Sequence, residues 1–486
     1  MLEIELKFQI PEARQRAIHK ALESKETEVI QLKAKYFDTA DKLLSKNGAA
    51  IRQRLEGKNW VQTLKAATKS QIERFEHNHD FGELENSPEL NLEIYQNDPE
   101  ASAILNHALA DQSSALQLQF ETDITRTSKI VHFQDAEIEV SLDIGEIRSQ
   151  DASHPVYEVE FELKSGATAS LLAFSFEWVK KYHLWLDVRS KAEIGHLLVA
   201  KQTVSPAKTS HEFNFNKKYT ADKNLRDLIA DQLNHLLPNI AAISAQVNDQ
   251  EHIDQAHIAL DHLHLTLSIF KDWSDDIVEK WSMQLAAFKN HFENLKHFKH
   301  MQNTLGALLQ NPKTAESLDK DILYAKEKLF NLVTSTQNVQ HFIQLLIFSV
   351  EQAKTAQKQD LRFYAHNTLQ HQYKQLQDAL NKADINDFES LDDLAKRLNE
   401  LKFSFPILTN VYDVKNLQKY AKALNEAQHA SEQYQVLSSS ASYLQESELE
   451  ASDWFALGWL TAKQENYAQT FLDATEQFLL SRKFLK

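Results

Sequence analysis

Two segments of the sequence place acidic residues at alternate positions and end each row with a lysine. Residues 3–7 read EIELK, and residues 158–164 read EVEFELK. Because successive side chains of a β-strand point to opposite faces, each segment presents carboxylates and an ammonium group on one face and apolar side chains on the other. Carboxylate oxygens are ligands that Mg²⁺ and similar cations prefer. We therefore expect one charged interior, built from strands near both ends of a single domain.

The same alternation of charged and apolar residues recurs between these two segments. It is found in residues 51–55 (IRQRL), 62–65 (QTLK), 74–78 (RFEHN) and 137–144 (EIEVSLDI). Charges that face an interior must be hydrated, paired or bound to metal. A closed barrel provides such an interior, because its inward and outward residues alternate along every strand. The apolar faces then point outward, and helices must cover them.

Further motifs extend the pattern along the first 195 residues or so. They are YFDT at residues 36–39, AIRQR at 50–54, TLK at 63–65, RFE at 74–76, TD at 122–123 followed by Arg126, DIGEI at 143–147, EVEFELKSG at 158–166 and SKAE at 190–193. In this order and spacing the sequence resembles the CYTH domain of the triphosphate tunnel metalloenzymes. One position departs from the pattern, since Asn78 stands where many members carry another Glu.

The resemblance implies roles for the charged residues. Arginine offers planar bidentate contacts to phosphate, and lysine offers a compact charge. The implied substrate-binding residues are Lys7, Arg52, Arg54, Lys65, Arg74, Arg126, Lys164 and Lys191. The implied metal carboxylates are Glu3, Glu5, Glu160 and Glu162, with Glu76, Glu139, Asp143 and Glu158 as further candidates. The implied catalytic set is Glu3, Glu5, Lys7, Glu160, Glu162 and Lys191, and the implied cofactor is Mg²⁺ or Mn²⁺.

The reaction that the resemblance implies is in-line attack of an activated water on a terminal phosphorus. No GxxxxGK[ST] motif is present, which excludes a P-loop route. Tripolyphosphate is the first expected substrate, because fusion to a second domain of the kind described below resembles the bacterial inorganic triphosphatases. Thiamine or nucleoside triphosphate hydrolysis, adenylate cyclase activity, and polyphosphate binding without turnover remain alternatives.

The sequence changes character after residue 200. Residues 202–219 lack apolar periodicity, and beyond them Leu, Ala, Gln and Lys recur at helical spacing. We predict a tunnel domain at 1–200, a linker at 201–218 and an all-helical domain at 219–486. By position, length and architecture this last region resembles a CHAD domain, a helical bundle that commonly follows CYTH domains. The predicted fold class is thus a closed antiparallel β-barrel with covering helices, followed by an all-α bundle.

Two predicted helices of the bundle carry apolar stripes but lack the cationic face that the resemblance implies. The stripes are Ile253, Ala256, Leu260, Leu263 and Leu267, and Leu391, Leu394, Leu398 and Leu401. Acidic residues and histidines replace most of the expected cations, at Asp254, His257, Asp261, His262, His264, Asp392 and Glu400. We therefore expect weak polyphosphate binding, and a docking or stabilising module for a protein partner. The histidine spacing does not place convergent ligands on one ion.

Composition excludes several classes of protein. The 486 residues include no cysteine and carry a net charge of −16, which argues against disulfides, thiolate metal sites and nucleic-acid binding. No leader sequence and no apolar run long enough to span a membrane is visible. We expect a cytoplasmic protein.

Overall fold

The computed structural model describes residues 2–109, 116–305, 312–354, 357, 359–412, 417–446 and 449–480. Its contacts divide the chain into two compact units. The first comprises Met1–Ser210, Ala230–Ala256 and Phe330–Glu351, and the second comprises His211–Ile229, His257–Leu329 and Gln352–Lys486. The units are discontinuous in sequence, because two stretches that follow the strands, residues 230–256 and 330–351, belong to the first unit. The predicted boundaries at 200 and 218 follow the change from strands to helices and stay a prediction.

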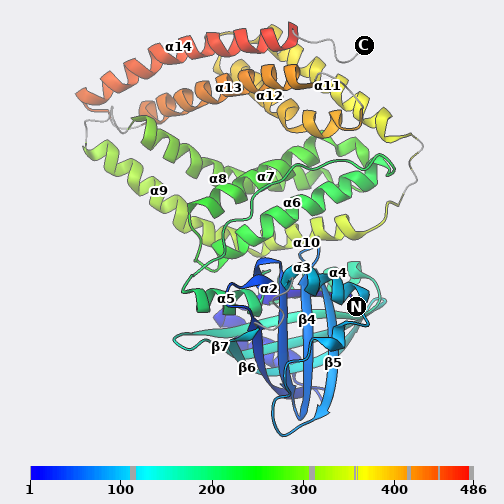
Figure 1. Cartoon of the computed structure of the whole chain (residues 1–486). Helices are drawn as coiled ribbons and strands as arrows, with labels where there is room; N and C mark the ends of the chain where they lie inside the picture. Colours follow the sequence, from blue (N-terminus) through cyan, green and yellow to red (C-terminus); the bar gives the residue numbers. More distant parts are fainter. Residues whose placement is uncertain are drawn as a thin grey trace. The chain divides into compact units, whose positions relative to one another are not determined.

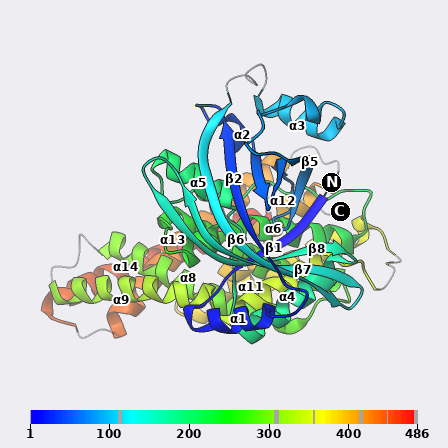
Figure 2. The same ribbon diagram turned by 90° about the horizontal axis from the view of Figure 1, so that it is seen from below.

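Eight antiparallel strands form the barrel of the first unit (Figures 1 and 2). The sheet order is β5-β4-β3-β2-β6-β7-β8-β1, and pairing of β5 with β1 closes it. This confirms the predicted barrel. The strands are β1 (Leu2–Gln9), β2 (Glu28–Asp38), β3 (Ala49–Glu56), β4 (Asn59–Ala67), β5 (Glu73–Glu83), β6 (Gln117–Phe133), β7 (Ala136–Arg148) and β8 (Ser153–Ser165), with a short β9 (Trp185–Leu186) beside β1.

The register of β1, β7 and β8 brings the two acidic segments side by side. Glu5 lies opposite Glu162, and Lys7 lies opposite Glu160. On the other side of β8, Glu139 lies opposite Glu162, which places three carboxylates in one row across three strands. The predicted alternation holds, since the apolar residues between them are buried on the outer face.

Helices cover that outer face, as the alternation predicts. Phe161 of β8 packs against Phe174 and Trp178 of α4 (Thr168–Tyr182), with ring centroids 5.2 Å apart in both pairs. Helix α5 (Lys191–Ala200) lies close against β6, because a Cβ atom on Gly195 would come within 2.2 Å of the Phe120 ring. The remaining short helices of this region are α1 (Gln15–Leu22), α2 (Leu43–Lys46) and α3 (Pro99–Leu109).

The regular elements that the structure describes from residue 221 onward are all helical. Both predicted apolar stripes are buried, in α7 and α12. None of the described helices is long and apolar enough to cross a membrane. The helices are α6 (Ala221–Ser244), α7 (Gln250–Ile269), α8 (Glu279–Leu305), α9 (Pro312–Val333), α10 (Thr336–Val350), α11 (Leu361–Lys382), α12 (Phe388–Thr409), α13 (Leu417–Glu446) and α14 (Ala451–Leu480), with one 3₁₀ turn at Lys271–Trp273.

Candidate active site

The barrel encloses a cavity of about 950 Å³ whose lining combines acidic and basic side chains. Nearly all of the residues singled out from the sequence line it. They are Glu3, Glu5, Lys7, Arg52, Arg54, Lys65, Arg74, Glu76, Arg126, Glu139, Asp143, Glu160, Glu162, Lys164 and Lys191. Glu158 lies behind this lining, where it contacts Lys191. The structure therefore brings the predicted set into one place, while the role of each residue stays a prediction.

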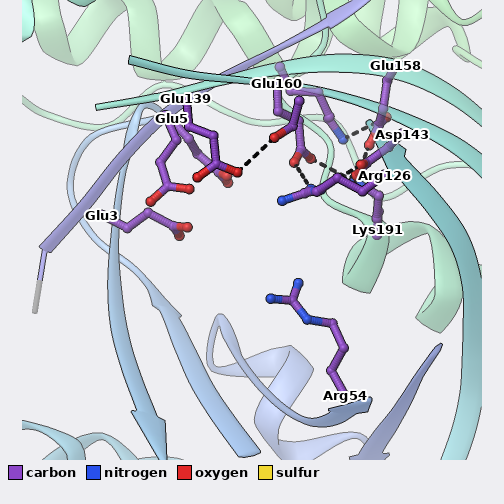
Figure 3. A network of polar contacts seen from close by, with 12 residues as sticks. Glu3, Glu5, Arg54, Arg126, Glu139, Asp143, Glu158, Glu160 and Lys191 are labelled. Atoms are coloured by element: carbon purple, nitrogen blue, oxygen red, sulfur yellow. Dashed lines mark hydrogen bonds and ion pairs between the residues drawn. The ribbon is translucent and has the colours of Figure 1, made fainter. Parts of the chain in front are cut away.

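A dense ion-pair cluster occupies one side of the cavity (Figure 3). The ammonium group of Lys191 lies 2.6–2.7 Å from carboxylate oxygens of Asp143, Glu158 and Glu160. Arg126 donates two hydrogen bonds of 2.7 Å to Asp143 and a third, of 2.5 Å, to Glu160. Burial alone would raise the pKa of Glu160, but Lys191 and Arg126 hold it well below its usual range.

A second group of carboxylates has much less compensating charge. Figure 3 shows Glu3, Glu5 and Glu139 gathered beside the first cluster. Lys164 reaches Glu139 at 2.8 Å and Glu162 at 2.7 Å, but its side chain is 36% exposed. Like charges directly opposite each other on neighbouring strands are destabilising. Burial accordingly raises the pKa of Glu162, despite the nearby Lys164.

Glu3 and Glu76 share Lys65 at the edge of this acidic group. The Lys65 Nζ atom lies 2.5 Å from Glu3 and 3.4 Å from Glu76. Burial raises the pKa of Glu3 to about 8, and the neighbouring Glu5 and Glu76 add to the rise. Burial also acts on Glu76, but Lys65, a hydrogen bond from Glu3 and Arg52 lower its pKa to about 2. The pKa values of the two neighbouring carboxylates therefore shift in opposite directions, and Glu3 takes up a proton more readily than Glu76.

Arginines face the acidic side across the cavity. Figure 3 shows Arg54 on the opposite side of the open space from the carboxylates. Arg54 donates to Glu56 at 2.6 Å through Nε. The Nε atom of Arg52 is buried and has no hydrogen-bond partner among the described residues. Arg74 reaches Glu5 only at 3.4 Å. A buried donor without a partner is costly, so Arg52 favours a nearby anion, and all three guanidinium groups line the cavity.

Carboxylate oxygens suit a hard divalent cation, and the cavity contains two groups of carboxylates that could bind one. Among the described residues, one acidic group has oxygen atoms all within 4.8 Å of one another, namely Asp143, Glu158 and Glu160. Lys191 and Arg126 already neutralise it. The group of Glu3, Glu5, Glu139 and Glu162 is only partly neutralised, by Lys65, Arg74 and the exposed Lys164, and it offers four carboxylates to a hard cation. The predicted metal set draws Glu160 from the first group and Glu3, Glu5 and Glu162 from the second.

Some residues of the site escaped the sequence analysis. Tyr36 lines the cavity and stacks on Phe120, with ring centroids 4.5 Å apart. Asp187 binds the Arg189 guanidinium at 2.8 and 3.0 Å, while the Arg189 carbonyl accepts a hydrogen bond from Lys7. In the sequence, Asp187 and Arg189 precede Lys191 at alternate positions, and this spacing could have indicated that they belong to the same charged site.

Asp261 and His264 of the helical region have ordinary hydrogen-bond partners, whereas the buried Nε2 atom of His257 has none among the described residues. Asp261 accepts from Lys289 at 2.9 Å, and His264 lies 3.2 Å from the Ser282 carbonyl. His257 is 9% exposed, and burial, with help from Lys296, lowers its pKa to about 4. No group of metal-ligand geometry occurs among the histidines that the structure describes.

Comparison with known proteins identifies the two regions. The model of the CYTH domain matches residues 1–196. These residues are a CYTH domain. An inorganic triphosphatase of Haemophilus influenzae is 33% identical over 170 residues, which cover 34% of this chain and 46% of that protein. The alignment thus spans about half the length of the curated relative.

The helical region has the fold of a CHAD domain. The solved CHAD domain of the plant Ricinus communis matches with a TM-score of 0.50 and 15% identity, over 57% of this chain and 96% of that one.

An adenylyl cyclase candidate from Hippeastrum is also similar, with a TM-score of 0.30 and 17% identity over 42% of this chain and 98% of that one. The predicted combination of a CYTH domain with a CHAD-like region is confirmed.

Proposed function

We propose that the CYTH domain hydrolyses inorganic triphosphate to pyrophosphate and phosphate with the help of a divalent cation, Mg²⁺ or Mn²⁺. One observation carries this proposal: the cavity holds arginines on one side, where the Arg52 Nε atom lacks a hydrogen-bond partner among the described residues, and a row of closely spaced carboxylates on the other. A polyphosphate anion with bound cations satisfies both sides at once. The CYTH match and the triphosphatase relative support the same activity.

Substrate binding falls to the cations that face the open space. Arg52 and Arg54 present guanidinium groups that can bind phosphate oxygens in pairs. Their partners within the protein, Glu76 at 4.0 Å and Glu56, leave donors available. Lys65 and Arg74 pair with Glu3 and Glu5 of β1, so phosphate oxygens bound to these cations would lie near the acidic group.

The chain's own residues prepare the reaction in two ways. Lys191 and Arg126 are held in place by their ion pairs with Glu160, and as preorganised donors they can stabilise charge developing on phosphate oxygens. Glu3, Glu5, Glu139 and Glu162 would hold the cation and orient water for in-line attack. A divalent cation bound there would lower the pKa of water and neutralise phosphate charge.

The alternatives differ in what must occupy the cavity beyond the phosphates. Thiamine triphosphate, ATP hydrolysis and ATP cyclisation all require space and contacts for an organic group. Binding of polyphosphate without turnover requires cations, and it does not explain the acidic row formed by Glu5, Glu139 and Glu162. We therefore rank inorganic triphosphate first.

The test is product analysis with the full-length chain. Tripolyphosphate, ATP and thiamine triphosphate are supplied in turn with Mg²⁺, with Mn²⁺ and with excess EDTA. We expect phosphate and pyrophosphate from tripolyphosphate, and loss of activity with EDTA. The matched variants are Glu5→Gln at the site and Glu12→Gln on the exposed surface, which make the same chemical change. Turnover that survives chelation, or that favours ATP, would overturn the proposal.

For the helical region we propose a docking or stabilising role for a protein partner rather than strong polyphosphate binding. Asp261 and Glu400 are tied to Lys289 and Arg397, at 2.9 and 3.1 Å, so the pairs carry no net charge toward a polyanion. The side chain of Asp392 is exposed, and desolvation by neighbouring atoms raises its pKa.

A further inference from the structure

Two chain segments outside the strands contribute to the lining of the cavity. The β4–β5 turn, residues 68–72, provides Gln71 and Ile72. The post-α5 segment, residues 202–208, provides Gln202, Ser205 and Pro206. Neither segment is regular structure, so neither is fixed by strand pairing. Contacts from elsewhere must hold both in place.

Residues 230–256, which belong to the first compact unit and include parts of α6 and α7, hold both segments by hydrogen bonds. Asn234 accepts a hydrogen bond from the Gln71 amide at 3.1 Å and donates to the Lys69 carbonyl. Asn239 binds both main-chain groups of Lys208, at 3.0 and 2.9 Å. The Nε2 atom of His252 donates to the Ser205 carbonyl at 3.0 Å.

Asn239 and His252 are buried side chains that depend on the post-α5 segment for part of their hydrogen bonding. Asn239 is fully buried and His252 is 2% exposed. Losing a partner leaves a buried polar group unsatisfied, which is costly. Asn239 also donates to the His235 carbonyl at 2.8 Å, and His252 lies 2.6 Å from Asp249 through Nδ1. The remaining hydrogen-bonding groups of both side chains are satisfied by the main chain of the post-α5 segment.

Each of the two segments forms a hydrogen bond with the helix or strand that carries a candidate active-site residue. Ser205 donates through its hydroxyl to Glu193 at 2.5 Å, and the Glu193 amide donates to the N-cap Ser190 at 3.0 Å. Lys191 lies between these two residues, at the start of α5. In the β4–β5 turn, the Ile72 carbonyl accepts a hydrogen bond of 3.0 Å from the Glu5 amide.

We propose that Asn234, Asn239 and His252 are positioning residues of the tunnel, which fix Lys191 and Glu5 through the two segments. The first helices after the barrel are therefore part of the machinery of the site. A displacement of about 1 Å in a catalytic group can cost about 100-fold in rate. The kinetic part of this inference rests on the proposed triphosphatase function, and the structural part does not.

A matched pair of substitutions at His252 in the full-length chain tests the inference. His252→Gln places an amide nitrogen near the position of Nε2 and keeps the hydrogen bond to Ser205. His252→Asn places one near Nδ1 and keeps only the contact with Asp249. We expect His252→Asn to lower kcat for tripolyphosphate about threefold to tenfold, the worth of one neutral hydrogen bond, with KM changed less than about twofold. His252→Gln should retain the wild-type kcat.

Amide hydrogen exchange provides a readout that does not need turnover. His252→Asn should speed exchange in residues 202–208 and in the first turn of α5 relative to His252→Gln, while β6 and β7 exchange as in the wild type. Ser205→Ala, which leaves α7 intact, should give the same pattern in α5. If the wild type does not hydrolyse tripolyphosphate, the proposed function fails and the exchange data decide alone. Equal exchange in His252→Asn, Ser205→Ala and the wild type would overturn the inference.

Discussion

Replacing Lys191 with methionine should destabilise the barrel more than any other single change to a lysine of the cavity. The ammonium group lies within 2.7 Å of three carboxylates, and the side chains of Asp143 and Glu158 are only 1% and 4% exposed. Methionine keeps the length and apolar stem of the side chain and removes its charge. After the change Arg126 still pairs with Asp143 and Glu160, but Glu158 retains only Lys7 and Gln9 among the described residues, each at 3.5 Å.

The magnitude follows from burial. Breaking a buried ion pair costs about 3–5 kcal/mol, because the remaining charge stays desolvated. Since Arg126 remains in place, we expect about 3 kcal/mol for Lys191→Met. Lys164 makes two ion pairs of similar length but is 36% exposed, and exposed pairs contribute about 0.2–1 kcal/mol. Lys164→Met is therefore the matched control, with an expected loss below about 1 kcal/mol.

The assay is hydrogen exchange at increasing urea concentrations, read on peptides of β7 and β8 so that the helical region does not mask the barrel. Mg²⁺ should restore part of the stability of Lys191→Met, because the variant loses the ammonium group between three carboxylates whose oxygen atoms lie within 4.8 Å of one another. Equal losses for the two variants, or no response to Mg²⁺ by Lys191→Met, would refute the view that Lys191 neutralises a buried acidic cluster.

Further predictions concern activity, pH and anion binding. Glu5→Gln should reduce metal-dependent phosphate release at least about 100-fold with an unchanged circular dichroism spectrum, while Arg54→Ala should raise KM and also lower kcat, because cations stabilise ground and transition states unequally. Stability from neutral His257 is present above pH 6.5 and is lost as pH falls toward its folded pKa of about 4, by about 2 kcal/mol near pH 5. Urea titrations at pH 7 and pH 5 should show this loss, and His257→Leu should abolish it. Filter binding at about 150 mM salt should detect little long-chain polyphosphate on the full-length chain, and Asp392→Arg should increase the amount bound. Tight binding by the wild type would contradict the proposal that acidic residues of the helical region prevent strong polyphosphate binding.

The sequence by itself determined which charged side chains share a face of each strand. Strand side chains alternate with a period of two, so the spacing of Glu3, Glu5 and Lys7 already assigned all three to one face. The apolar stripe of α7 likewise predicted a buried helix, because residues three and four apart share one side. These inferences needed only local geometry, and the structure bears them out.

The tertiary structure decided which charges meet. Glu160 and Glu162 are two residues apart on the same face of β8, yet their pKa values shift in opposite directions. Glu160 meets Arg126 from β6 and Lys191 from α5, whereas Glu162 lies opposite Glu5 and Glu139. No local pattern distinguishes them, because their environments come from elements distant in sequence. The anchoring of the cavity segments by α6 and α7 depends on long-range packing in the same way.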